Sequence, residues 1–257
     1  MKFVFLDKAI YTVLTFTKGV NVMNEFNYNG SMSGVSGINA YLTKVFTKMG
    51  LGLLVTALVA FVTEYFGLYY RFFMVTGSLG LILLVAVQFG LCISLGRNLL
   101  NKDVRTTNLL FMGYAAVTGF SLSSLFQVYA TGTLAAAFLF TAILFFSMAI
   151  IGHMTSVDLS KFSGLLMGGL IALVITTVVS MFVPVLANSL LISYIGIILF
   201  LALTAWDMQR IKQLYYHVGD YGTVGENVAV YGAFELYLDF LNIFLYVLQI
   251  LGTRRDN

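Results

Sequence analysis

Two acidic residues lie in the last two apolar stretches of the chain, where a charge is costly. Asp207 stands in LALTAWDMQR at residues 201–210, and Asp239 stands in YGAFELYLDFLNIFLYVLQILG at residues 231–252. A charged side chain near the bilayer centre costs roughly 3 kcal/mol or more, so it usually faces a bundle interior or a water-filled path and has a partner. Two such carboxylates late in a hydrophobic chain indicate an ion or proton site.

Two further polar residues accompany Asp239. Glu235 precedes it by four residues and Asn242 follows it by three, so the three side chains share one face of a helix. This face indicates either an auxiliary role of Glu235 and Asn242 at the same site or side-chain hydrogen bonds that hold neighbouring helices together. Glu235 is also close enough to the expected end of the span to be hydrated at the membrane interface.

Asp207 lies within one turn of a basic helix end, so an interfacial ion pair with Arg210 or Lys212 is the simpler alternative. The apolar run before it, residues 190–205, is shorter than the roughly 20 residues that cross the hydrocarbon region, which favours a position inside the membrane edge. Arg97, at the expected inner end of the second span, is a candidate counter-ion. Its simpler interpretation is a basic residue that sets the orientation of the protein.

The composition indicates what class of protein holds these carboxylates. Of the 257 residues, 60% are hydrophobic and 10% are charged, whereas a soluble globular domain carries about 25% charged residues. The mean hydropathy is +0.93. We therefore expect an all-α membrane protein, and a net charge of +3 is too small to indicate nucleic acid as a partner.

Hydropathy predicts seven transmembrane helices. We expect a flexible or interfacial cytoplasmic N-terminal tail at residues 1–37, a transmembrane domain at 38–252 and a short tail at 253–257. The connections between spans are short except for one at residues 211–230. The expected spans are 47–66, 74–96, 108–129, 133–152, 163–187, 189–209 and 231–252.

Basic residues predict the orientation, because cytoplasmic loops are enriched in lysine and arginine. Eleven basic residues fall on the side of the N-terminus and three on the other, which places the N-terminus in the cytoplasm. Seven spans then put the C-terminus outside, although Arg254 and Arg255 leave a re-entrant last segment as the alternative. The eleven are Lys2, Lys8, Lys18, Lys44, Lys48, Arg97, Lys102, Arg105, Lys161, Arg210 and Lys212, and the three are Arg71, Arg254 and Arg255.

The sequence lacks the motifs of several classes of enzyme. The chain has no P-loop, no dinucleotide-binding fingerprint, no HExxH and no GxSxG, and its two histidines are not at metal-ligand spacing. An intramembrane aspartyl protease would also place two carboxylates on adjacent spans. Its GxGD sequence is missing, because Gly219 and Asp220 follow His217 and Val218. We therefore expect no enzyme activity and no cofactor.

At the two aspartates the chain resembles the transmembrane Bax-inhibitor-motif family, in its bacterial type. The resemblance covers roughly residues 37–252, and the two aspartate motifs together are its most specific part. YIGIILFLALTAWDMQRIK at 194–212 resembles the penultimate helix of the family, and AFELYLDFLNIFLYVLQILG at 233–252 resembles the terminal one. GINAYLTKVFTK at 37–48, MGYAAVTGFSLSS at 112–124 and DLSKFSGLLMGG at 158–169 resemble earlier parts of the family.

The resemblance implies seven helices, of which the last is central and surrounded by the other six. It implies that Asp207 and Asp239 form a hydrogen-bonded pair in a pore that faces the cytoplasm, with Arg97 as the arginine that contacts the pair. Bacterial members are similar to a pH-sensitive calcium leak, so the expected partners are the bilayer, calcium ions and protons. The expected location is a bacterial inner membrane.

Two functions follow as hypotheses. In the first, the pair is the gate of a cation leak: two carboxylates at one site do not both ionise easily, so they bind and release a proton as a unit. Deprotonation then leaves like charges that repel and attract Ca²⁺ transiently, because hard cations prefer oxygen ligands. In the second, the protein does not conduct but regulates cell death, stress or membrane-protein quality control through membrane-protein partners.

Overall fold

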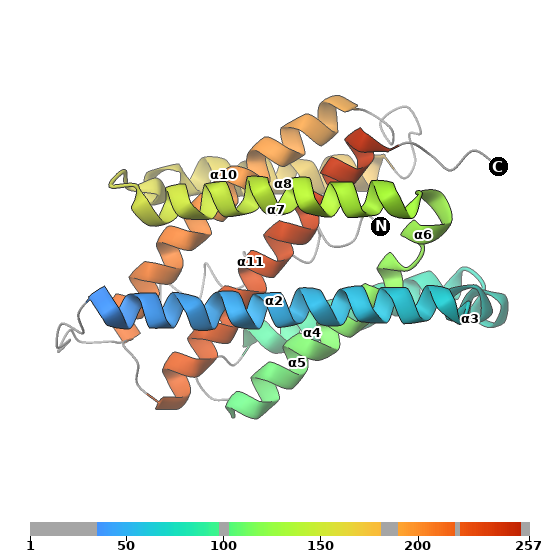
Figure 1. The fold of residues 1–257 in the computed structure, drawn as a ribbon, viewed down its shortest axis with the longest axis horizontal. Coiled ribbons are helices and arrows are strands. Elements are labelled where there is room, and N and C mark those ends of the chain that lie inside the picture. The colour runs from blue at the N-terminus through green and yellow to red at the C-terminus, as the bar shows by residue number, and fades with distance from the viewer. Residues whose placement is uncertain (1–34, 98–102, 181–189, 219–221, 253–257) are drawn as a thin grey trace. The chain divides into compact units, whose positions relative to one another are not determined.

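The computed structural model describes residues 35–97, 103–180, 190–218 and 222–252 (Figure 1). These residues fall into two compact units. Unit 1 comprises Phe126–Arg210 and residues 238–252, and unit 2 comprises residues 35–125 and Ile211–Tyr237. The helices α10 (Leu190–Val218) and α11 (Gly222–Leu251) each contribute one end to each unit.

Seven helical segments are long and apolar enough to cross a membrane, which confirms the predicted all-α fold with seven candidate spans. Only helices and closed barrels satisfy every backbone hydrogen bond inside a bilayer, so long apolar stretches of this kind fold as helices. The segments are Gly37–Tyr65, Leu79–Gly96, Val104–Val128, Thr131–Met154, Leu159–Thr177, Leu190–Tyr216 and Gly222–Leu251.

The helices differ from several of the predicted span boundaries. The first helix, α2 (Val35–Tyr65), begins well before residue 47 and includes the last residues of the predicted tail. The second predicted span is interrupted, because α3 (Leu68–Thr76) ends at Gly77, whose φ of 58° is a conformation that favours glycine. The predicted connection at 211–230 is helical at 211–218 and 222–230. The rest of the N-terminal tail and residues 253–257 lie outside the described residues.

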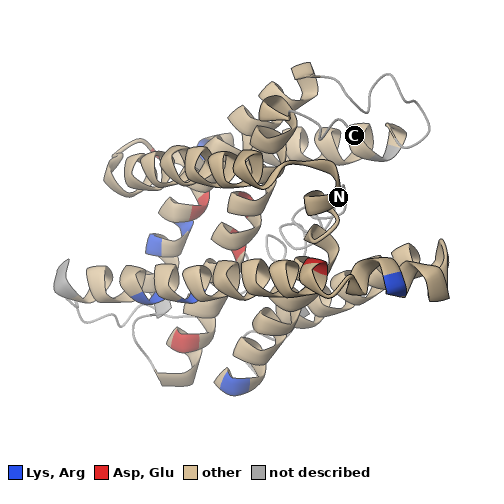
Figure 2. Ribbon diagram, turned by 45° about the vertical axis from the view of Figure 1, so that its right-hand side comes forward, with Lys and Arg blue, Asp and Glu red and all other residues tan. Residues whose placement is uncertain are grey.

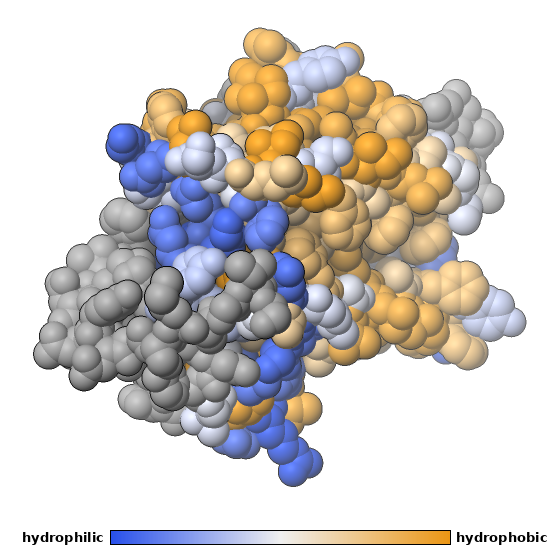
Figure 3. Space-filling model, turned by 60° about the vertical axis from the view of Figure 1, so that its left-hand side comes forward, coloured by the Kyte–Doolittle hydropathy of each residue, from blue (hydrophilic) through white to orange (hydrophobic). Residues whose placement is uncertain are grey.

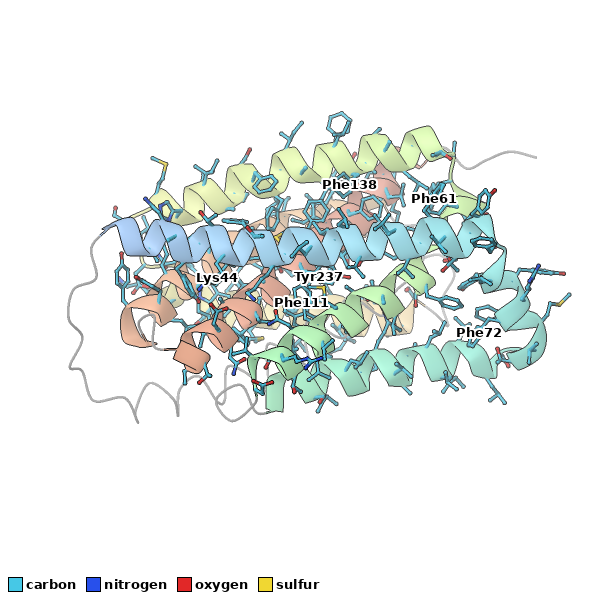
Figure 4. All side chains as sticks on the ribbon, turned by 60° about the horizontal axis from the view of Figure 1, so that its bottom comes forward. Lys44, Phe61, Phe72, Phe111, Phe138 and Tyr237 are labelled. Atoms are coloured by element: carbon cyan, nitrogen blue, oxygen red, sulfur yellow. The ribbon has the colours of Figure 1, made fainter. Side chains whose placement is uncertain are left out.

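Unit 2 is built around α2, α4 (Leu79–Arg97) and α5 (Val104–Leu122), together with the first half of α11. Phe111 of α5 contacts Tyr237 of α11 edge to face at 5.4 Å (Figure 4). The hydroxyl of Thr56 on α2 lies 2.7 Å from the hydroxyl of Tyr237 and 3.0 Å from the carbonyl oxygen of Ala115. A Cβ at Gly119 would lie 2.5 Å from the Thr56 carbonyl oxygen, so α2 and α5 approach closely there, as small residues allow in membranes.

Unit 1 contains α7 (Thr131–Met154), the short 3₁₀ helix η1 (Leu159–Phe162), α8 (Ser163–Val179), most of α10 and the second half of α11. Phe138 and Phe145 of α7 both contact Phe240 of α11, at 5.2 and 5.5 Å between ring centroids. Gly169 of α8 lies against Leu199 of α10. Within this unit, α7 therefore packs against α11 and α8 packs against α10.

Large apolar side chains remain exposed on the helix faces, which suits contact with lipid. Figure 3 shows how much of one face of the molecule they cover. Helix α11 is the exception: 78% of its apolar window is buried, against 11–44% for the other six. This burial agrees with a central place of the last helix, which stays a prediction. Examples of exposed residues are Leu58 and Phe61 on α2, Ile82 on α4, Leu139 and Ile143 on α7 and Leu165 on α8.

Candidate functional site

Asp207 and Asp239 both lie in unit 1 and both are completely buried. Charged residues are sparse on the described helices (Figure 2), so two buried acids on consecutive helices stand out. No part of the Asp207 surface is accessible, and the alternative of an ion pair with Arg210 or Lys212 stays a prediction. Its neighbour Trp206 is also buried, and the Arg210 guanidinium lies 5.6 Å from the Trp206 ring centroid, at a distance typical of a cation–π contact.

The aromatic ring of Tyr246 sets the register between α10 and α11 in unit 1. The ring lies directly against Gly196, where no Cβ would fit, and its centroid is 6.2 Å from that of Phe200. The two helices run in opposite directions (Figure 1). Asp207 follows Phe200 by seven residues and Asp239 precedes Tyr246 by seven, about 10 Å along each axis.

Helical periodicity also orients the two acids. Residues seven positions apart lie within about 20° of each other around a helix axis, so Asp207 projects from the side of α10 that holds Phe200. Asp239 likewise projects from the side of α11 that holds Tyr246. The contact between Phe200 and Tyr246 and this periodicity favour the predicted pairing of the two carboxylates, which stays a prediction.

Two contacts hold the segment of α10 around Asp207 in place. Gly152 of α7 lies so close to the backbone of Ala205 that a Cβ at this glycine would overlap it. Two residues after Asp207, the amide of Gln209 donates a hydrogen bond to the Val157 carbonyl oxygen and accepts one from the Leu159 amide, both at 2.8 Å. Hydropathy does not reveal either contact, because small residues and interfacial glutamines are common in membrane helices.

Asp158 lies in the same connection, between α7 and η1, and caps η1. Its carboxylate accepts hydrogen bonds from the hydroxyl and the backbone amide of Ser160, and these bonds lower the pKa of Asp158 below its ordinary value. The side chain is fully exposed. It is therefore a local cap of the connection that Gln209 holds.

Glu235 and Asn242, the predicted auxiliary residues, are both completely buried on α11. The alternative in which Glu235 is hydrated at the membrane interface is therefore wrong. Within unit 2, the Glu235 carboxylate accepts a 2.7 Å hydrogen bond from the Tyr231 hydroxyl. The predicted counter-ion Arg97 is the last residue of α4, in unit 2, and its side chain lies outside the described part of the structure.

Two of the lysines assigned only to orientation have a further role. Lys44 on α2 contacts the Glu226 carboxylate of α11 at 2.5 Å, and Lys48 lies 3.6 Å from the same carboxylate. Lys48 also donates a 3.0 Å hydrogen bond to the Asn108 side chain on α5. This network joins three helices of unit 2, and a charge count along the sequence does not reveal it.

The chemistry open to this arrangement is proton and cation binding by oxygen. Across the described residues, no group of three or more His, Cys, Asp or Glu side chains is arranged to hold a metal ion. Because Ca²⁺ takes six to eight oxygen ligands, a cation at two carboxylates would keep much of its water. Such a site suits transient occupancy. The site residues remain predictions.

Comparisons with known proteins bear on the family. The model of the family described as inhibitor of apoptosis-promoting Bax1 (Bax1-I) matches residues 38–256. The chain is 35% identical over 221 residues to the inner membrane protein YbhL of Escherichia coli, covering 86% of this chain and 94% of that protein. It is 36% identical over 220 residues to the uncharacterized protein RP147 of Rickettsia prowazekii, covering 86% and 92%. The chain therefore belongs to the Bax1-I family and is an integral, multi-pass membrane protein.

Proposed function

We propose that the protein is a proton-gated cation leak of a bacterial inner membrane, with Asp207 and Asp239 as its gate. The observation that carries the proposal is the complete burial of two acids whose helices face each other in unit 1. Burying an acidic side chain in a membrane-spanning helix costs free energy, so such residues are usually found where they bind ions or protons. Inner-membrane location is supported by the name of the E. coli relative.

In this mechanism the pair carries one proton in the closed state. Two adjacent carboxylates do not both ionise easily, so a shared proton bridges them and holds α10 against α11. Loss of the proton leaves two like charges, which weakens this contact and attracts a hard cation such as Ca²⁺. The leak therefore opens as the pH on the accessible side rises.

The test is Ca²⁺ flux into liposomes that hold purified full-length protein, measured from about pH 5 to pH 8, a range wide enough to follow a carboxyl pair that shares a proton. Asp207→Asn and Asp239→Asn each remove the shared-proton site, so each should change the flux and abolish its pH dependence. Glu64→Gln is the matched control, because it also replaces a carboxylate by an amide, but at the C-terminal end of α2. Wild-type behaviour of both aspartate variants would exclude the pair as the gate.

A second candidate is a regulator that does not conduct and acts on other membrane proteins. The description of the family as an inhibitor of an apoptosis-promoting protein favours it. In that case the aspartates only stabilise the contact between α10 and α11. Wild-type protein would then show no flux above that of empty liposomes, and both aspartate variants would differ from it only in melting temperature.

A further inference from the structure

Asn242 is completely buried in α11, yet among the described residues neither its amide oxygen nor its amide nitrogen has a hydrogen-bond partner. Buried polar side chains are almost always hydrogen-bonded, to protein or to ordered water. A buried primary amide with both ends unpaired by protein therefore points to a bound water molecule or ion.

Asn242 is aligned with the predicted gate. It follows Asp239 by three residues and precedes Tyr246 by four, so the three side chains occupy one face of α11 on successive turns. The rise is about 4.5 Å from Asp239 to Asn242 and about 6 Å from Asn242 to Tyr246. The amide is thus the next polar group along this face from the carboxylate.

Tyr246 lies one turn beyond Asn242 on the same face of α11. Its ring lies directly against Gly196 and near Phe200, both on α10, in the same unit as Asn242. Along this face of α11, Asn242 therefore lies between the carboxylate of Asp239 and the aromatic ring of Tyr246.

We propose that the amide oxygen of Asn242 binds the permeating cation, or a water molecule of its hydration shell, at a second step one turn beyond Asp239. This inference rests on the proposed cation leak. An amide oxygen is a ligand that hard cations accept, and because it is uncharged it holds the ion less strongly than a carboxylate does. Conduction requires such weak, successive sites, so that an ion attracted by the gate can also leave.

Thr141 of α7 offers a matched control. It is completely buried too, and its hydroxyl has no hydrogen-bond partner among the described residues. It shares a helix face with Phe138 and Phe145, which contact Phe240. Phe240 and Asn242 lie on opposite sides of α11, because two residues correspond to about 200° around a helix.

The experiment compares Asn242→Leu with Thr141→Val in the liposome Ca²⁺ flux assay. Asn242→Leu removes the amide oxygen but keeps the number and branching of the side-chain heavy atoms, and we expect its flux to fall about fivefold, as for the loss of one ordinary hydrogen-bonding group. Thr141→Val should conduct like the wild type. We also expect Asn242→Leu to melt no lower than the wild type, because it removes an unpaired buried amide.

The outcomes separate this inference from the function on which it rests. If Asp239→Asn changes the flux while Asn242→Leu does not, the gate stands and the second step is overturned. If the wild type shows no flux above that of empty liposomes, both fail. Should Asn242→Leu melt lower than the wild type, Asn242→Val is tested in its place, and a low melting temperature of both variants overturns the inference in favour of a structural amide.

Discussion

Replacement of Gly196 by alanine tests the register between α10 and α11 on which the gate depends. A Cβ at Gly196 would lie closer than 3.0 Å to three ring carbon atoms of Tyr246, and a ring anchored on its own helix has little room to move. Overpacking of this kind costs about 1–3 kcal/mol. The same substitution at Gly168 of α8 meets nothing within 4 Å, so it should gain about 1 kcal/mol from helix propensity alone.

The two variants are therefore compared with each other. Both receive the propensity gain, so the difference between them is the steric cost at Tyr246. A cost of about 2 kcal/mol corresponds to a melting temperature about 4–8 °C lower for Gly196→Ala than for Gly168→Ala in a chain of this size. Thermal unfolding of the purified protein in detergent measures the difference.

A double-mutant cycle assigns the cost to its partner. Tyr246→Leu in the Gly196→Ala background should restore most of the lost stability, because residues in direct contact show coupling of about 0.5–3 kcal/mol. If Gly196→Ala melts like Gly168→Ala, Tyr246 does not lie against Gly196. The register that would bring Asp207 level with Asp239 would then be wrong.

Three further predictions concern the contacts around the site. Tyr237→Phe should cost about 1 kcal/mol of unfolding free energy and much less in a Thr56→Val background, because the two hydroxyls bond each other. Gln209→Leu should speed hydrogen exchange of the segment 157–159, measured by mass spectrometry, because two 2.8 Å hydrogen bonds are lost. Asp158→Ala should speed exchange at the start of η1 at neutral pH. The pKa of this carboxyl is lowered in the folded protein, so its stabilising effect is complete above the ordinary pKa and lost as the pH falls through the lowered value.

Each of these predictions has a control of the same chemistry. Tyr194→Phe changes an exposed tyrosine and should leave the free energy of unfolding unchanged. Gln127→Leu changes an exposed glutamine and should leave hydrogen exchange of the segment 157–159 unchanged. Asp103 precedes α5 without a side-chain capping bond, so Asp103→Ala should leave exchange at its helix unchanged. An effect of a control variant as large as that of its test variant would contradict the corresponding contact.

The spans and their limits show where hydropathy stops being informative. All seven predicted spans overlap helices, because an apolar stretch of this length has no other way to satisfy its backbone in lipid. The predicted connection at 211–230 is helical at both ends, since its residues continue α10 and begin α11. A helix that extends beyond the membrane keeps its internal hydrogen bonds. Hydropathy measures only affinity for lipid, so it does not reveal where such a helix ends.

The acids illustrate the same division within the site. Asp207 and Asp239 stand out in the sequence because a charge in an apolar run is rare. Whether such an acid is exposed depends on its neighbours: Glu235 resembles an interfacial residue in the sequence and is completely buried in the fold. Gly152 and Gly196 give no signal at all, because the sequence does not say which glycine meets a backbone or a ring and which faces lipid.

The sequence alone determined that this protein is a membrane-spanning bundle of helices with two acids in its last two spans, because hydropathy and charge are properties of the residues themselves. The tertiary structure decided which side chains are buried, that Tyr246 lies against Gly196, and that an asparagine beside the second acid has no hydrogen-bond partner among the described residues. These features depend on how helix faces meet. Contacts between residues that are distant in the chain determine which helix faces pack together, and the local sequence pattern does not specify these contacts.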